Sequence, residues 1–189
     1  MLCLAAVSLP AQSPIEVETE EYRGLLCGSS FAPLQLGIGW IDHAQLFDGD
    51  ADCFAALGAA GLIQRSAMVS FAPFNMLKKN WFLQCGALLN AVENNWVIAA
   101  APCSLAQINH GLQAGVIDLA TANFGLQTAL VNISTAGMGI QIGALNSGGM
   151  LQIGLCNSEG DLQIGVLNYN PKAPIPWMPL LNFSRRGGD

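Results

Sequence analysis

The amino-acid sequence predicts an all-β fold of tandem repeats, a β-solenoid or β-roll with repeats of 11–15 residues. Two observations lead to this prediction. A seven-residue phrase recurs at near-constant spacing, and apolar and polar side chains alternate within it. The five clearest copies are Leu112–Asp118, Leu126–Asn132, Ile140–Asn146, Leu151–Asn157 and Leu162–Asn168. A fixed short period of this kind is typical of stacked or meandering repeat proteins.

The last residue of each phrase is polar and forms a regular series along the chain. In the five clear copies the series advances by 14, 14, 11 and 11 residues, and degenerate copies extend it on both sides. Asn tolerates tight turns, so we expect these residues to form a structural ladder at one corner of the repeat. The predicted ladder consists of Asn75, Asn90, Ser104, Asp118, Asn132, Asn146, Asn157, Asn168 and Asn182.

The alternation within the phrase predicts strands. Positions one, three and five are mostly apolar, position two is Gln, and position four is Gly or Ala. A period of two places the apolar side chains on one face of a strand and the Gln and small residues on the other. Position six is apolar again, so we expect a bend that turns this side chain back into the core.

Two architectures fit this pattern. In a β-solenoid each repeat is one coil, identical residues stack, and the apolar row fills a narrow interior. In an antiparallel β-meander or small β-barrel each repeat is one strand and a turn, which absorbs the change from 14 to 11 residues more easily. We favour the solenoid because it explains why Asn recurs at one position.

The chain divides into four predicted parts. Residues 1–13 are apolar and end in small residues, which is typical of a signal peptide, although a basic start is missing and a buried N-terminal strand is the alternative. Residues 14–54 are expected to be an irregular N-terminal segment with the first strands, including a copy of the phrase at Leu34–Trp40. The tandem β-repeat domain follows over 55–183, and 184–189 form a disordered tail.

The charge of the chain excludes one class of partner. The formal net charge is −6 and the sequence pI is about 4.7, whereas nucleic-acid binding needs a concentrated basic face. Between Asp118 and Glu159 there is no charged side chain at all. The apolar runs are interrupted too often for a membrane-spanning helix, which needs about 20 apolar residues.

No catalytic, cofactor or metal motif stands out. Asp42 and His43 are half of a hydrolytic triad without a matching Ser elbow. His110 precedes a repeat strand, and Phe124 and Met138 occupy the same place one and two periods later, so we expect it to pack. The acidic stretch Asp48–Asp52 matches a calcium loop poorly. We therefore predict no enzyme activity and no cofactor.

The cysteines and tryptophans allow more than one interpretation. Removal of the leader leaves five cysteines, of which Cys27 and Cys53 are the candidate disulfide pair; the alternative is that all five are small buried side chains. The four Trp residues lie at repeat edges, at Trp40, Trp81, Trp96 and Trp177. They either close the ends of a thin core or form a belt that faces sugar or membrane.

The repeats resemble those of a family of exported bacterial surface-repeat proteins, whose copies read Gly-Φ-Gln-Φ-Gly-Φ-Φ-Asn, with Φ apolar. The resemblance covers Leu83 to Phe183 well and residues 34–82 loosely, and its most specific part is Leu162–Asn170 followed by Pro174–Phe183. It implies a location in the bacterial cell envelope, at the surface or in the periplasm. It implies no activity and no catalytic residues.

The expected function is that of an exported envelope repeat protein with a structural or adhesive role. Its partner would be a protein or glycan ligand, with association with the outer membrane left open and nucleic acid excluded. The main alternative is a small integral outer-membrane β-barrel, although strands of about seven residues are short for the ~9–11 that a span needs. A hydrolase based on Asp42 and His43 is the weaker alternative.

Overall fold

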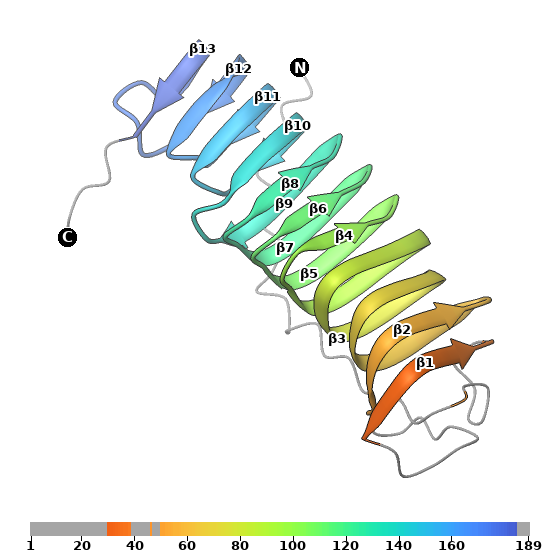
Figure 1. The fold of residues 1–189 in the computed structure, drawn as a ribbon. Coiled ribbons are helices and arrows are strands. Elements are labelled where there is room, and N and C mark those ends of the chain that lie inside the picture. The colour runs from red at the N-terminus through yellow and green to blue at the C-terminus, as the bar shows by residue number, and fades with distance from the viewer. Residues whose placement is uncertain (1–29, 39–45, 47–49, 185–189) are drawn as a thin grey trace.

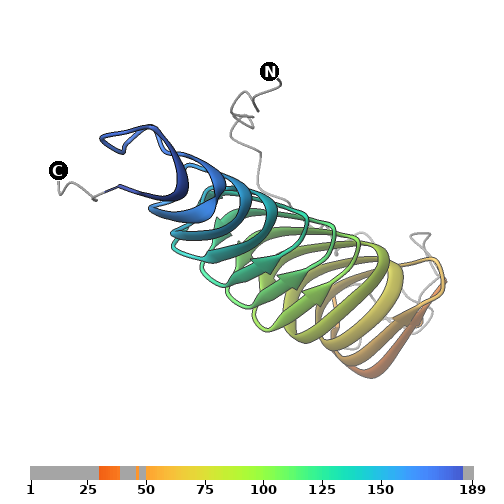
Figure 2. The same cartoon turned by 90° about the horizontal axis from the view of Figure 1, so that it is seen from above.

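The computed structural model describes residues 30–38, 46 and 50–184, and this part of the chain is built from strands and turns. No helix in it is both long and apolar enough to cross a membrane. The strands wind into a rod of stacked coils (Figure 1), and a view along a second direction shows the coils following one axis (Figure 2). The predicted β-solenoid is therefore confirmed.

The strands follow one another along the rod in chain order, with β3 long enough to wind through more than one coil. Their bounds are β1 Phe31–Gly37, β2 Asp52–Gly58, β3 Gly61–Asn95, β4 Ile98–Ala100, β5 Cys103–Asn109, β6 Leu112–Ala114, β7 Ile117–Asn123, β8 Leu126–Thr128, β9 Val131–Ala136, β10 Ile140–Ser147, β11 Leu151–Ser158, β12 Leu162–Tyr169 and β13 Trp177–Phe183.

Parallel pairing in constant register distinguishes the solenoid from the antiparallel alternatives. Leu112 pairs with Leu126, Leu126 with Ile140, and the same phrase position continues to pair through β11 and β12. Among the described strands, only β12 and β13 pair antiparallel. The stacking begins before the predicted repeat domain, because β1 already pairs in parallel with β2.

The change from 14 to 11 residues narrows the coil. Each 14-residue coil has a short and a longer strand, such as β8 and β9, whereas β10 is one strand that pairs with both. The pairing with β9 stops at Ile133, so the rest of β9 has no counterpart in β10. Gly148 and Gly149 have φ values of 79° and 86°, a left-handed conformation that Gly adopts without a steric penalty. This turn replaces the missing part of the coil.

The interior of the solenoid is polar, which corrects the prediction that the apolar row would fill it. The Gln at position two is fully buried in every clear copy of the phrase, and the polar residue at position seven is buried as well. Large apolar side chains at positions three, five and six lie outward instead, including Val116, Ile153 and Leu167. The bend at position six therefore does not return that side chain to the core.

The small cross-section explains what fills the interior. The buried apolar cluster is mostly Ala, and its large members, Leu62, Leu77 and Val92, all lie in β3. The later coils hold stacked Gln and Asn side chains instead. Small residues let the two walls of a coil approach each other, and amide side chains fill the remaining space only where they are hydrogen-bonded.

The close stacking predicts that Gly154→Ala destabilises the fold. A Cβ at this position would overlap the carbonyl oxygen of Gly143 in the preceding coil, and backbone cannot move aside cheaply. We expect the free energy of unfolding to fall by about 2 kcal/mol or more, measured by denaturant unfolding followed by circular dichroism. Leu155→Ala, on the exposed exterior of the same coil, is the control and should change it much less.

Candidate interaction surface and its buried polar frame

A ladder of Gln side chains runs through the interior at position two. Gln127 donates to Gln113 at 3.1 Å, Gln141 to Gln127 at 2.9 Å, and Gln152 to Gln141 at 3.0 Å. Gln163 continues the ladder to Gln152 at 3.1 Å. The parallel register places these amides one above another, so each side chain finds its partner in the adjacent coil.

The predicted Asn ladder occupies one corner of the coil. Register pairs Asn90 through to Asn168 in unbroken order. Asn132 donates to Asn146 at 2.8 Å, and its Nδ2 also donates to the carbonyl of Ile142 at 3.0 Å. Asn75, which lies one coil before Asn90, makes the matching bond to the carbonyl of Cys85. The ladder thus bonds coil to coil and also satisfies corner backbone groups.

Asn182 does not belong to this corner. It pairs with Gln163, while Asn168 pairs with Met178. The reason is that β13 runs antiparallel to β12, which reverses the order of its residues against the ladder positions. Asn182 therefore extends the Gln row by one residue and donates to the carbonyl of Pro176 at 3.1 Å.

A second Asn ladder lies at another corner, and the repeat phrase did not reveal it. Asn80 donates to Asn95 at 2.8 Å, Asn95 to Asn109 at 2.7 Å, and Asn109 to Asn123 at 2.8 Å. A signal was present in the sequence, since each of these Asn residues directly precedes Trp81, Trp96, His110 or Phe124. The ladder ends at Asn123, because Gly137 takes this position in the last 14-residue coil.

Asp118 interrupts the first Asn ladder. Its side chain is fully buried, and neither carboxyl oxygen has a hydrogen bond of normal geometry among the described residues. Burial raises the pKa of this carboxyl to about 7, and a looser contact with the Thr128 backbone opposes the shift. Asn132, one coil further on, likewise has an Oδ1 without a partner. A carboxylate carries no N–H group to donate, so the bond that Asn132 makes to Asn146 is not matched by one from Asp118. Ser104, its neighbour on the other side, also leaves its Oγ unpaired.

The outer surface of the solenoid is apolar over a long stretch. Between Glu93 and Glu159 the only acidic or basic side chains are His110 and the buried Asp118. Exposed Leu130 and Leu155, at 62% and 58%, lie at the same corner two coils apart. We call the exterior of residues 98–158 the apolar band. Large exposed apolar areas mark sites where a protein contacts a partner or a membrane.

A column of rings lies on the outer surface beside the second Asn ladder. Trp81 stacks on Trp96 with centroids 6.0 Å apart, Trp96 on His110 at 4.6 Å, and His110 on Phe124 at 5.7 Å. His110 therefore packs within the column. At the other end of the rod Tyr169 contacts Trp177 at 4.5 Å. Trp40 lies outside the described residues.

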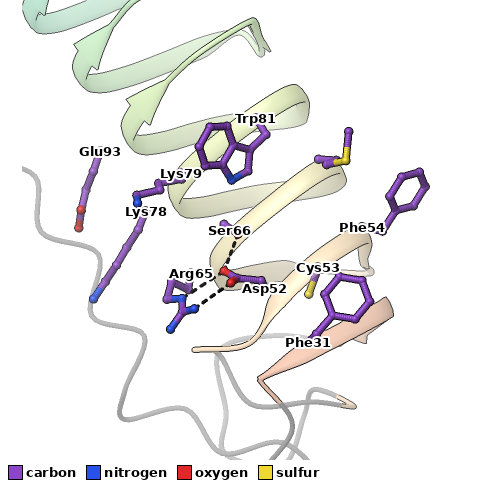
Figure 3. A pocket seen from close by; sticks show the side chains of 11 residues that line it. Phe31, Asp52, Cys53, Phe54, Arg65, Ser66, Lys78, Lys79, Trp81 and Glu93 are labelled. Carbon is purple, nitrogen blue, oxygen red and sulfur yellow. Dashed lines mark hydrogen bonds and ion pairs between the residues drawn. The ribbon is translucent and has the colours of Figure 1, made fainter.

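A hollow of about 860 Å³ lies over β2 and β3 near the N-terminal end of the rod (Figure 3). Arg65 donates to both oxygens of Asp52, at 3.1 and 2.8 Å, and Ser66 donates at 2.6 Å. The hydrogen bond from Arg65 lowers the pKa of the Asp52 carboxyl, so the pair adds stability at neutral pH that is lost in acid. Because both side chains are partly exposed, that contribution is less than about 1 kcal/mol.

The hollow is lined by charged side chains and by one thiol, that of Cys53. Its lining contains no His. Cys53 is buried, and desolvation, with the nearby Asp52 charge, raises the pKa of its thiol to about 12, whereas a nucleophilic thiol needs a lowered pKa. No group of three His, Cys, Asp or Glu side chains suited to a metal ion occurs in the described part of the chain.

Several predicted site residues fall outside the structural description. Asp42, His43, Asp48 and Cys27 belong to the segments that the structure does not describe, as do residues 1–13 and 185–189. Cys53, the other member of the candidate disulfide, carries a free thiol. Asp52, at the end of the acidic stretch, is occupied by its pairing with Arg65.

Comparisons with protein-family models, with curated proteins and with solved structures find no match for this chain.

The interrupted ladder predicts that Asp118→Asn stabilises the protein. The new amide can donate to Asn132 and to a corner carbonyl, as Asn132 does one coil later. Satisfying these buried groups should raise the free energy of unfolding by about 1–3 kcal/mol at pH 7, measured by urea unfolding. The reverse change, Asn146→Asp, removes bonds to Asn157 and Ile153 and should destabilise by a similar amount. If both variants changed the free energy of unfolding in the same direction, that result would contradict the ladder argument.

The environment of Cys53 predicts a free but unreactive thiol. Burial and its raised pKa should protect it from iodoacetamide at pH 8 while the protein is folded. In urea without reductant the same thiol should be alkylated, as detected by peptide mass spectrometry. Failure to label it until a reductant is added would instead show a disulfide.

Proposed function

We propose that this chain is an exported protein of a bacterial cell envelope that acts through contacts of its outer surface, as a structural or adhesive element, and not by catalysis. The observation that carries this proposal is the apolar band, where no exposed carboxylate, Lys or Arg interrupts the solenoid between Glu93 and Glu159. An uncharged surface of this extent is costly to leave in water. It is therefore a surface for contact with something else.

Three further features support the proposal. The apolar leader at residues 1–13 is typical of exported proteins. The repeats resemble those of exported surface proteins. Hydrogen bonds between neighbouring coils also hold the rod together, and a stack of repeats offers an extended surface for binding.

The hydrolase alternative depends on residues that the structure does not describe, Asp42 and His43. In the described part, the hollow beside Asp52 contains the Arg65–Asp52 ion pair, the Ser66 hydroxyl bonded to Asp52, and a buried thiol, and no His lines it. We therefore keep contact through the outer surface as the proposed function.

Export is tested by fractionating a Gram-negative host that produces the full chain. We expect the protein in the envelope fraction, with an N-terminus after residue 13 by mass spectrometry. A variant without residues 1–13 should remain in the cytoplasm and serves as the matched control. A full-length chain that stays in the cytoplasm and retains Met1 would overturn the proposal.

A further inference from the structure

We infer that the apolar band is covered by the acyl chains of a lipid bilayer, and that the solenoid crosses the bilayer with its axis along the membrane normal. This inference rests on the proposed envelope function and names the partner of its outer surface. The strands are then perpendicular to the membrane normal. The length of the membrane-spanning part therefore depends on the number of coils and not on the length of a strand.

The height of the band matches a bilayer. Position-one residues pair in register from Leu83 through Ile98, Leu112, Leu126 and Ile140 to Leu151. Five steps of about 4.8 Å therefore separate the coil of Glu93 from the coil of Glu159, a height of about 24 Å. The outward apolar band of proteins that cross outer membranes with strands is about 25 Å tall.

Large apolar side chains lie outward on more than one side of the coil, although the exterior also carries His110 and Thr135. In the coil that begins at Leu112, Val116 and Ile117 lie at one corner, exposed by 47% and 41%, and Phe124 lies at another, exposed by 51%. The half-buried Leu119 lies outward on the side between them. A second copy or a protein ligand would cover one side of such a rod, whereas lipid surrounds it. For this reason we choose lipid over a second copy of the chain.

The ends of the band carry the residues that favour a membrane interface. Trp96 lies in the coil of Glu93, and Tyr169 lies in β12 beside Trp177. Six coil steps, about 29 Å, separate Trp96 from Tyr169, which is close to the ~30 Å thickness of a hydrocarbon core. Trp and Tyr are enriched at both membrane interfaces. Lys78, Lys79 and Lys172 lie beyond these levels, whereas Glu159 and Asp161 lie in the coil just before that of Tyr169.

The polar groups of the band are largely satisfied within the protein, as hydrocarbon requires. The parallel pairings join backbone groups of neighbouring coils, so the sides of the rod present no free sheet edge. Gln and Asn side chains lie inside and bond along the axis. On the exterior, Thr135 donates its hydroxyl to the carbonyl of Thr121 at 2.7 Å, and Thr128 donates to that of Gln113 at 3.3 Å.

The first test compares one charge at the centre of the band with the same charge at its edge. Leu130 is 62% exposed in the central coil, and Leu88 is 53% exposed in the coil of Glu93. Purified full-length protein is mixed from detergent with phosphatidylcholine vesicles and floated on a density gradient. Wild type should float with the vesicles. Leu130→Lys should reduce the partition coefficient between vesicles and water by about 30-fold or more. Leu88→Lys should reduce it by about fivefold or less.

Both variants change exposed side chains, and circular dichroism in detergent checks that each keeps its β-structure. Equal floatation of the two Lys variants would overturn the inference, because it shows that depth along the rod does not matter. A wild-type chain that stays out of the vesicles as a discrete dimer would also overturn it, and would identify a second copy as the partner.

The second test measures orientation by polarised infrared spectroscopy of oriented bilayers. Coil-to-coil hydrogen bonds run along the solenoid axis, so a spanning rod aligns its carbonyl groups with the membrane normal. A rod lying on the surface places them in the membrane plane, and that result would overturn the inference. Both tests use purified protein and are independent of export. Vesicle insertion without export would refute only the proposed function, and export without insertion would refute only the spanning rod.

Discussion

The hydrogen bond between equivalent amide side chains of adjacent coils is the interaction on which the rest of the structure depends. A Gln or Asn carries both a donor and an acceptor, so the same residue repeated at one coil spacing can donate in one direction and accept from the other. The Gln ladder and the two Asn ladders use this property along the interior. A buried amide without such a partner would be costly, which explains why the rows tolerate few exceptions.

The amide rows in turn determine where the apolar residues go. Strand side chains alternate between the two faces, so once Gln and Asn occupy the interior, the Leu, Ile and Val at intervening positions must lie outside. The coil is too narrow to hold both sets, as its mostly Ala cluster shows. The apolar exterior is therefore a consequence of the polar frame.

In a solenoid, the length of a strand does not limit the thickness of a membrane that the protein could cross. Strands of seven or eight residues are too short to cross a bilayer from end to end, which weighs against an ordinary spanning strand. In a solenoid they need not do so, because the coils add height along the axis. The shift to 11-residue coils, one coil after the second Asn ladder has ended, removes part of the longer side of the coil, while the Gln ladder and the first Asn ladder continue unchanged.

The sequence by itself determined that the chain forms strands in a tandem repeat and that position seven recurs at one place from Asn90 to Asn168, and it favoured one coil per repeat over an antiparallel meander. These features follow from local periodicity and from the identity of repeated residues. Only the tertiary structure decided which face is inside, because an alternating pattern looks the same whether its apolar row is buried or exposed. It also decided the place of Asn182, because the reversal of β13 depends on how the last coil is closed. The apolar band could not be recognised from the repeat phrase for the same reason, because the packing of the coil decides which side chains are buried.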